Sequence, residues 1–491
     1  MKTSKKASLD VHSTGDEGLD RILGGGIPAQ SILLLAGEPG SGKTVLTMQM
    51  LFQAARQGKK CLYFTTVSEP AIKVARYMQL FDFFDVALLD KYVIFADLAA
   101  ALREGADRTL AEIESRVEKD EPAFVAIDSF RAVGALLRAP DDLRAFIYDL
   151  SVKMAGWGAT TFLVGEYTRD EYSSFAEFAI ADGIVRLGSE RQALTSVREM
   201  EVLKLRGAAY SSGLHFFDIT HAGVSFYPRV SAPSDTKNEP SAESDERVFT
   251  GVEGLDELLG GGIPRGSSTI IQGGTGAGKT LLSLQFLIAG AKRGEKGVLF
   301  TLEETPEQLR SIGRALGWDL PQLEERGLLL LHHTSPVELS TDRFLYEART
   351  RVTRLGAKRA VFDSLTTMAL GVPSDRRFKE MVYALAKHMR GDVVSLLMTV
   401  ESEQLLGSAQ LSGQGVSFIA DNLVQMRYVE LGGRLERAIS VLKARGIEHN
   451  SELRSLTIEK KAGLKVVQGR FKELRGVLTG LPVRDPESRH E

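Results

Sequence analysis

Cysteine, tryptophan and net charge are all scarce in this chain of 491 residues. Cys61 is its one cysteine, which excludes a disulfide within the chain and a zinc site built from several cysteines, and favours a reducing compartment. The net charge of -3 provides no basic tail for nucleic acid and no polybasic membrane patch. No apolar stretch reaches the ~20 residues that span a bilayer, and residues 1–10 lack the apolar core of a signal peptide. These absences predict a cytoplasmic protein.

Glycine is abundant, and it recurs in two loops of one pattern. Residues 37–44 read GEPGSGKT and residues 273–280 read GGTGAGKT. Both fit G-x-x-x-x-G-K-[ST], in which backbone N–H groups surround phosphate oxygens, the lysine reaches the outer phosphates and the last hydroxyl binds Mg²⁺. Each loop follows an apolar run and precedes a helical pattern, so a helix N-terminus adds its dipole to the anion site. The loops predict two sites for ATP and Mg²⁺.

The residues expected to contact nucleotide lie at the end of each loop and the start of the next helix. In the first half they are Gly40, Ser41, Gly42, Lys43, Thr44 and Val45, and in the second half Thr275, Gly276, Ala277, Gly278, Lys279, Thr280 and Leu281.

Two apolar segments end in aspartate. Residues 124–128 (FVAID) and 359–363 (RAVFD) are typical of buried strands. If Asp128 lies beside Thr44, and Asp363 beside Thr280, each pair can hold Mg²⁺, the aspartate acting through water. A strand-end aspartate can instead cap the following turn. The loop upstream of each aspartate favours the metal role.

The chain contains an internal repeat. Residues 13–28 and 249–264 share a Thr-Gly-x-x-Gly-Leu-Asp opening and a Gly-Gly-Gly-Ile-Pro run, and residues 202–207 (VLKLRG) match 441–446 (VLKARG). Such agreement over long separations indicates duplication. In each copy short apolar runs alternate with helical periods, which predicts an α/β fold with a mostly parallel sheet flanked by helices.

The repeat predicts two tandem ATPase domains, residues 11–228 and 247–480. Residues 229–246 are polar and rich in proline and serine, which is typical of a flexible linker. Residues 481–491 form a short tail.

The two copies differ after their second strand. The second copy has Glu303 and Glu304, where a carboxylate can orient or deprotonate the nucleophile that attacks a γ-phosphate. Two glutamates there could instead only favour a helix dipole. The first copy has Val67 and Ser68 at these positions, and Glu69 one place further on. The first site is therefore expected to bind nucleotide, whereas hydrolysis there is not predicted by these residues.

A Lys-x-Arg pair recurs late in each copy. It comprises Lys204, Leu205 and Arg206 in the first and Lys443, Ala444 and Arg445 in the second. On a strand, residues two apart point the same way, so the two cations suit the phosphates of a nucleotide, including one held by a neighbouring subunit. A solvated basic edge strand is the alternative.

Together these features resemble the KaiC-like family of duplicated RecA-like P-loop ATPases, from about residue 13 to residue 480. The likeness rests on the repeated openings, both loops, the Glu303-Glu304 pair, the strand-end aspartates and both Lys-x-Arg pairs. It also includes residues 404–430, which resemble the segment with the family's phosphorylated hydroxyls. The resemblance implies two tandem RecA-like domains in a homohexameric double ring, with ATP between subunits.

The resemblance implies different roles for the two halves. The first half would be a slow ATPase that forms the ring. The second would be a serine/threonine autokinase that phosphorylates a neighbour's hydroxyl and reverses this, with Glu303 as general base. Arg437 matches an arginine of the family that contacts nucleotide. A KaiB-like protein or a signalling histidine kinase is the implied partner, whereas the short tail does not match the docking site of a KaiA-type activator.

The resemblance also assigns the phosphorylation sites. Ser417 matches the family's phosphorylated serine, Phe418 replaces the adjacent threonine, and Ser412 falls where a further threonine lies. The matching stretch of the first half, residues 178–182, has no hydroxyl at the Ser417 position. We expect phosphorylation at Ser417 and Ser412, and at most part of a two-site cycle.

Two other functions fit the same residues. One is a nucleotide-switched signalling scaffold without phosphotransfer, which the residues at 67–68 and Phe418 favour. The other is a RecA-type DNA motor, which requires basic loops that face nucleic acid. Residues 171–175 are not notably basic, so nucleic acid is not a predicted partner.

Overall fold

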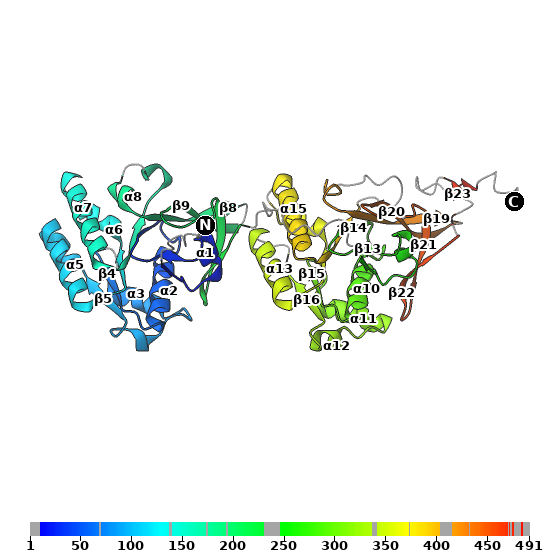
Figure 1. Cartoon of the computed structure of the whole chain (residues 1–491), viewed down its shortest axis with the longest axis horizontal. Coiled ribbons are helices and arrows are strands. Elements are labelled where there is room, and N and C mark those ends of the chain that lie inside the picture. Colours follow the sequence, from blue (N-terminus) through cyan, green and yellow to red (C-terminus); the bar gives the residue numbers. More distant parts are fainter. Residues whose placement is uncertain are drawn as a thin grey trace, which may run out of the picture. The chain divides into compact units, whose positions relative to one another are not determined.

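The protein is described by a computed structural model that divides into two compact units after Arg229 (Figure 1). It describes residues 10–67, 70–136, 140–172, 175–192, 195–229, 246–335, 341–372, 374–402, 415–431, 433–469, 471, 474–475 and 483–484. Within these ranges no helix is long and apolar enough to cross a membrane. The predicted linker falls outside the described residues except at its two ends, and most of the predicted tail does too.

Nine of the described strands form the sheet of the first unit, in the order β11-β10-β9-β8-β3-β7-β6-β4-β5. Their bounds are β3 (Ile32–Gly37), β4 (Cys61–Thr65), β5 (Val93–Asp97), β6 (Phe124–Asp128), β7 (Thr160–Glu166), β8 (Gly183–Gln192), β9 (Thr195–Leu205), β10 (Leu214–Thr220) and β11 (Gly223–Tyr227). Strands β3 to β8 are parallel, and β9 to β11 continue the sheet in antiparallel fashion. Every residue of β3 is buried, as expected for a central strand covered on both faces.

Helices cover both faces of this sheet (Figure 1). The helices are α1 (Glu17–Ile22), α2 (Lys43–Arg56), α3 (Ala71–Met78), α4 (Ala99–Glu104), α5 (Ala106–Asp120), α6 (Phe130–Leu136), α7 (Pro140–Trp157) and α8 (Ala176–Ile180), with 3-10 turns η1 (Val86–Leu88) and η2 (Arg169–Glu171) and a short ladder of β1 (Val11–His12) and β2 (Ile27–Pro28). Leu33 and Leu35 share a core with α1, α2 and α3, whereas Leu34 and Ala36 share one with α5, α6 and α7. The alternation of side chains along each strand thus supplies two apolar faces.

The second unit repeats this plan, with the strand order β16-β15-β17-β18-β14-β19-β20-β21-β22. Its strands are β12 (Arg247–Val248), β13 (Ile263–Pro264), β14 (Ser268–Gly273), β15 (Gly297–Thr301), β16 (Leu329–His333), β17 (Arg359–Asp363), β18 (Ser395–Glu401), β19 (Asn422–Leu431), β20 (Arg434–Ala444), β21 (Arg454–Glu459), β22 (Gly463–Val467), β23 (Leu474–Arg475) and β24 (Val483–Arg484). Its helices are α9 (Leu255–Leu258), α10 (Lys279–Ala291), α11 (Pro306–Leu316), α12 (Leu320–Glu325), α13 (Thr341–Leu355), α14 (Leu365–Leu370) and α15 (Asp375–Gly391).

The two units confirm the predicted fold class. Each is a mostly parallel sheet between helical layers, built on the same connections in both halves of the chain. In the second unit α9 to α12 pack on one face, and α13 to α15 on the other.

Each glycine-rich loop joins a central strand to a helix that begins at the motif lysine. Gly42 and Gly278 precede helices α2 and α10 with φ of 95° and 110°, a left-handed conformation that glycine adopts without strain. The sequence pattern placed the helices two residues later, at Val45 and Leu281. The earlier start brings the lysine and threonine of each motif into the first helical turn, where free N–H groups face the loop.

Candidate functional site

The first loop wraps around its own lysine. The Lys43 ammonium donates hydrogen bonds to the carbonyl oxygens of Gly37 (2.9 Å) and Glu38 (2.8 Å), and a longer one to the Ser41 hydroxyl (3.4 Å). Burial lowers the pKa of Lys43, although the carboxylate of Glu166 opposes this shift. A cation held this way at the mouth of a strand–loop–helix turn is placed to meet phosphate oxygens.

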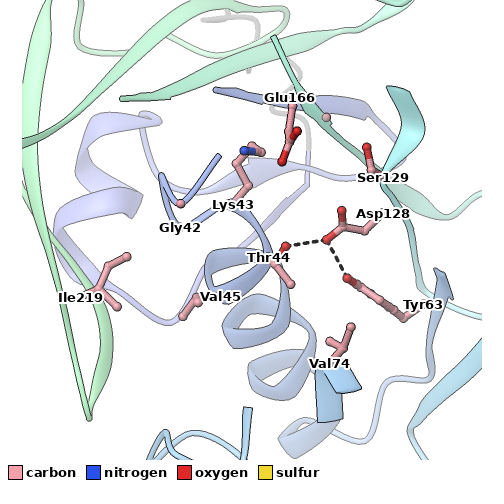
Figure 2. Close-up of a pocket in the computed structure, with 12 residues that line it drawn as sticks. Gly42, Lys43, Thr44, Val45, Tyr63, Val74, Asp128, Ser129, Glu166 and Ile219 are labelled. Carbon is pink, nitrogen blue, oxygen red and sulfur yellow. Dashed lines mark hydrogen bonds between the residues drawn. The ribbon is translucent and has the colours of Figure 1, made fainter. Parts of the chain in front are cut away.

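Asp128 lies beside this loop at the end of β6. Its carboxylate accepts hydrogen bonds from the hydroxyls of Thr44 and Tyr63, both at 2.7 Å, as Figure 2 shows. Lys43 and Glu166 extend into the same space (Figure 2). Together these side chains surround a pocket of about 450 Å³. The pocket is lined by Gly40, Gly42, Lys43, Thr44, Val45, Tyr63, Val74, Asp128, Ser129, Gly165, Glu166 and Ile219.

The second loop has the same construction. The Lys279 ammonium donates to the carbonyls of Gly273 (2.9 Å) and Gly274 (3.0 Å). The Thr280 hydroxyl donates to the Asp363 carboxylate at 2.8 Å, and the Thr399 hydroxyl donates to its other oxygen. Burial raises the pKa of Asp363, and the two hydroxyl hydrogen bonds oppose the rise. The aspartate and the motif threonine are therefore brought together in both halves.

These oxygen pairs suit a magnesium ion. Hydroxyl and carboxylate oxygens are the ligands that Mg²⁺ prefers, and it usually takes one or two protein groups together with substrate phosphates. In the described part of the chain no three His, Cys, Asp or Glu side chains gather as a metal site. Thr44 with Asp128, and Thr280 with Asp363, thus fit a magnesium ion that arrives with a nucleotide.

The two glutamates of the second half have different surroundings. Glu303 is exposed, and its carboxylate accepts hydrogen bonds from the hydroxyls of Ser364 (2.7 Å) and Thr367. Glu304 is half-buried, and its Oε2 has no hydrogen-bond partner among the described residues. Burial, followed by the nearby charges of Asp363 and Glu303, raises the pKa of Glu304. Of the pair, Glu303 is the carboxylate that an incoming group can reach.

The first half offers no carboxylate at the matching point. Val67 is exposed there, while Ser68 and Glu69 lie outside the described residues. Among the described residues that line the pocket, the acidic groups are Asp128 at the end of β6 and Glu166 at the end of β7.

The remaining residues of the loops take supporting positions. Ser41 and Ala277 are buried, and Gly40 and Gly276 have positive φ. Thr275 donates its hydroxyl hydrogen bond to Glu401 at the end of β18. Leu281 packs against the core beneath α10.

Arg437 reaches the second loop from strand β20. Its Nε donates to the Gly276 carbonyl at 3.2 Å, and its guanidinium lies 5.4 Å from the ring centre of Tyr428. The Tyr428 hydroxyl donates to the same carbonyl at 2.7 Å. The structure therefore places Arg437 at the glycine-rich loop of its own domain.

In each sheet the Lys-x-Arg pair lies at the end of the strands that is opposite to the glycine-rich loop. Leu205 is buried opposite Gly183, the first residue of β8. Strand β8 runs parallel to β3, and Gly183 pairs near the start of β3 whereas the loop follows the end of β3. The six residues of β3 span roughly 17 Å between these two ends. Lys204 and Arg206 thus lie at the end of the sheet away from their own loop. Arg206 does not lie on the strand, because β9 ends at Leu205, and the shared face of the two cations stays a prediction.

The second half repeats this separation. Ala444, the half-buried last residue of β20, lies opposite Asn422, the first residue of β19, and Arg445 follows it. The Lys443 ammonium donates to the carbonyls of Ser417 (3.2 Å) and Ala420 (2.6 Å). Ser417, Lys443 and Arg445 therefore gather at the end of the sheet away from Glu303. These groups thus lie away from the loop of their own domain.

The structure describes one of the two predicted phosphorylation sites. Ser412 lies outside the described residues. Ser417 is half-buried, and Phe418, next to it, is 59% exposed.

Sequence reasoning missed the groups that hold the two aspartates. Tyr63 comes from the strand beside β6 in the first half, and Thr399 from the strand beside β17 in the second. The motif names neither residue, and the strand order that brings them to the aspartates is not written in the sequence.

Comparison with known proteins agrees with the geometry. A family model described as "ATPase: KaiC" matches the chain twice, over residues 12–231 and 248–470. The circadian clock oscillator protein KaiC of Picosynechococcus sp. is 29% identical over 480 residues, which cover 95% of this chain and 91% of that protein. The protein of the same name from Acaryochloris marina is 29% identical over 497 residues, covering 98% and 94%. Since the family model spans most of both units, this chain belongs to the KaiC family of ATPases.

Proposed function

We propose that the chain binds Mg²⁺ and ATP at both loops, assembles into a homohexameric ring, and transfers a γ-phosphate to Ser417 of a neighbouring copy. The observation that carries this proposal is that the two sets of groups lie at opposite ends of the strands of the second sheet. One end holds the loop, Asp363 and Glu303, and the other end holds Ser417 with the Lys443 and Arg445 pair. A ring that sets one end against the other in the next subunit completes the site.

The transfer step follows from these groups. The Ser417 hydroxyl oxygen attacks the γ-phosphorus in line, a new O–P bond forms, and the bond to the β–γ bridging oxygen breaks, which releases ADP. Glu303 accepts the hydroxyl proton, since it is exposed and is held in place by Ser364 and Thr367. When bound, Mg²⁺ neutralises charge that develops on the phosphate oxygens. When water replaces the hydroxyl, the same arrangement hydrolyses ATP.

The first domain serves chiefly to bind ATP and to hold the ring together. Its lysine, threonine and aspartate are arranged as in the second domain, and Val67 stands where Glu303 stands. Without the carboxylate we expect slower hydrolysis there, because general-base assistance is worth about 10²–10⁴-fold in rate. We also propose a clock-like signalling role, with a KaiB-like protein or a histidine kinase as partner, and its support is the resemblance to the family.

Intact mass spectrometry after incubation with Mg²⁺ and ATP tests the proposal. Under denaturing conditions we expect added phosphate that decreases in Ser417→Ala and disappears when Ser417→Ala and Ser412→Ala are combined. Under native conditions we expect six subunits with ATP and smaller species without it. Absence of any added phosphate on the wild-type chain would eliminate the kinase activity and leave the ATPase.

A nucleotide-switched scaffold is the second candidate, and Phe418 is the observation that favours it. An apolar side chain that is 59% exposed replaces a hydroxyl and suits contact with another protein surface. Capture of partners by the ring in ATP and in ADP separates the two cases, because a switch requires different binding in the two states.

A further inference from the structure

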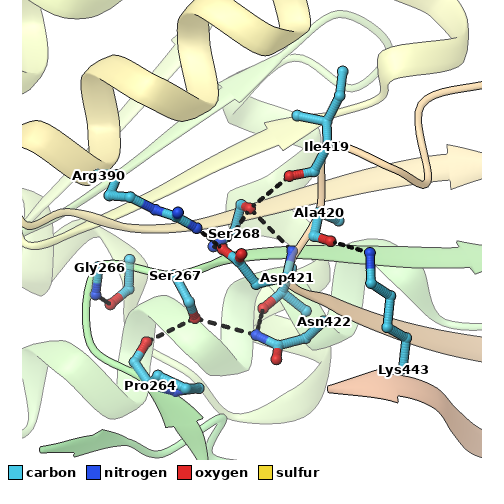
Figure 3. Close-up of polar contacts among 12 residues, drawn as sticks. Pro264, Gly266, Ser267, Ser268, Arg390, Ile419, Ala420, Asp421, Asn422 and Lys443 are labelled. Carbon is cyan, nitrogen blue, oxygen red and sulfur yellow. Dashed lines mark hydrogen bonds and ion pairs between the residues drawn. The ribbon is translucent and has the colours of Figure 1, made fainter. Parts of the chain in front are cut away.

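Asp421 anchors the start of strand β19 beside the Lys443 pair. It is 6% exposed, and its carboxylate accepts hydrogen bonds from the backbone N–H and the hydroxyl of Ser268, both at 2.9 Å. Arg390, from the end of α15, forms an ion pair with the same carboxylate, as Figure 3 shows. The carboxylate of Asp421 is therefore already neutralised by a neighbouring guanidinium.

The matching aspartate of the first half has a different cation. Asp182 precedes β8 as Asp421 precedes β19, and it accepts a hydrogen bond from the backbone N–H of Ile32 at 3.1 Å. Its ion pair is made with Arg206, at 3.2 Å. Arg206 is the arginine of the first Lys-x-Arg pair.

One substitution between the halves accounts for this exchange. Residues 389–391 read Met-Arg-Gly and residues 154–156 read Met-Ala-Gly. Arg390 and Ala155 each lie five residues before the next strand, β18 and β7 respectively. An alanine provides no charge for Asp182, so Arg206 supplies it.

Arg445, the matching arginine of the second half, has no such ion pair among the described residues. Its backbone N–H donates to the Asp421 carbonyl at 3.0 Å, as the N–H of Arg206 donates to Asp182 at 2.9 Å, so the two arginines leave the backbone from equivalent places. The Arg445 side chain is exposed, and among the described residues it has no hydrogen bond or ion pair. The two arginines thus differ in their side chains and not in their backbone position.

We propose that Arg390 is a positioning residue. Its ion pair with Asp421 leaves the Arg445 side chain available to contact the ATP held by a neighbouring copy, whereas in the first domain Asp182 restrains Arg206 through an ion pair. This inference rests on the proposed function, in which the Lys-x-Arg pair acts on a neighbour's nucleotide. It adds that one substitution between the halves, Arg390 against Ala155, gives the two domains different activities.

The size of the effect is bounded by the exposure of the restraining pair. The Arg206 side chain is 62% exposed and that of Asp182 is 32% exposed. Solvent screens such a pair, so its formation changes the fraction of free arginine by up to about fivefold. We expect changes of about two- to fivefold in rate, well below the loss that follows removal of the arginine itself.

A crystal structure of full-length Arg390→Ala tests the exclusion directly, without reference to activity. We expect the Arg445 guanidinium within ion-pair distance of Asp421, and in Arg390→Lys, the matched control, we expect it to stay clear. If Arg445 stays clear of Asp421 in Arg390→Ala, the inference is wrong.

The rate of phosphate incorporation into Ser417 tests the consequence. Arg390→Ala should lower this rate about two- to fivefold in the wild-type chain and should not lower it further in an Arg445→Ala background. A loss of similar size in both backgrounds means that Arg390 acts through stability, which overturns the inference. If Arg445→Ala leaves the rate unchanged, the contact with a neighbour's nucleotide is wrong, and this consequence is wrong with it.

The reverse substitution gives an independent measurement. Ala155→Arg supplies the first half with the missing cation, so Arg206 should be released and the remaining ATP hydrolysis should rise about two- to fivefold. This is measured with Glu303→Gln present, so that the second domain contributes little turnover. Equal turnover with alanine or arginine at position 155 contradicts the restraint of Arg206 by Asp182.

Discussion

Replacing Glu303 by glutamine separates chemistry from binding in the second domain. The side chain is exposed, and its partners Ser364 and Thr367 are hydroxyls that can donate equally well to an amide oxygen. We therefore expect the stability of the protein to change by no more than about 0.5 kcal/mol. The loop that grips the phosphates is untouched, so nucleotide affinity should stay within about twofold of wild type.

The expected loss is in rate. A general base is worth about 10²–10⁴-fold, which corresponds to about 3–5 kcal/mol of activation free energy. The assay follows phosphate on Ser417 by intact mass spectrometry, with ATP hydrolysis measured in parallel. Glu304→Gln is the matched control, because its buried oxygen is not accessible to the attacking hydroxyl. A Glu303→Gln rate within twofold of wild type, together with a large loss in Glu304→Gln, would refute the assignment of the base.

Three further predictions concern stability and metal use. Burial raises the pKa of Asp16 to about 6 from 3.8, so protonation of this carboxyl favours the folded state, and the stability present below pH 4 is lost as the pH rises through 6. Asp16→Asn keeps the hydrogen bond from the Leu19 N–H. In urea unfolding, this variant should be more stable than wild type by about 2–3 kcal/mol at pH 7.5 and equally stable near pH 4. Thr280→Ala removes the hydroxyl beside the second aspartate and should raise the Mg²⁺ concentration that half-saturates Ser417 phosphorylation by about tenfold or more. Arg359→Met removes one of the two guanidinium partners of the Glu295 carboxylate, and Arg265 remains as the other. It also removes the donor to the carbonyls of Phe249 and Phe286, so we expect a cost of about 3 kcal/mol in calorimetry.

Motifs with a fixed mechanical requirement were the part of the site that sequence could predict. A phosphate loop has to follow a strand and open a helix, so the pattern at Lys43 and at Lys279 fixed the local structure of both turns. A strand that ends in aspartate has to end close to the loop for the aspartate and the threonine to act together, although β7 lies between β3 and β6, and β18 between β14 and β17. The hydroxyl-to-carboxylate distances of 2.7 Å and 2.8 Å at Asp128 and Asp363 agree with that requirement, while the metal role itself stays a prediction.

The contacts that escaped prediction all depend on strand order and register. Tyr63 meets Asp128 because β4 pairs with β6, and Asp128 lies opposite Thr65, two residues further along β4. The restraint of Arg206 by Asp182 depends on how far β9 extends along β8. Side-chain periodicity says which face of a strand is buried, but it does not say which strand is the neighbour or where the pairing begins.

The segment before β8 in the first half and before β19 in the second half has a different role in each half. In the first half its position matching Ser417 is Phe178, whose ring packs edge-on against Tyr167 at 5.1 Å. The Tyr167 hydroxyl in turn donates to the buried Glu177 at 2.5 Å, so this side chain is part of the core. A phosphate acceptor has to leave the core and approach within about 3 Å of the γ-phosphate. The same position cannot satisfy both demands, and we infer that the first half kept the packing, whereas the second half, in which Ser417 is half-buried, kept a hydroxyl that can act as the acceptor.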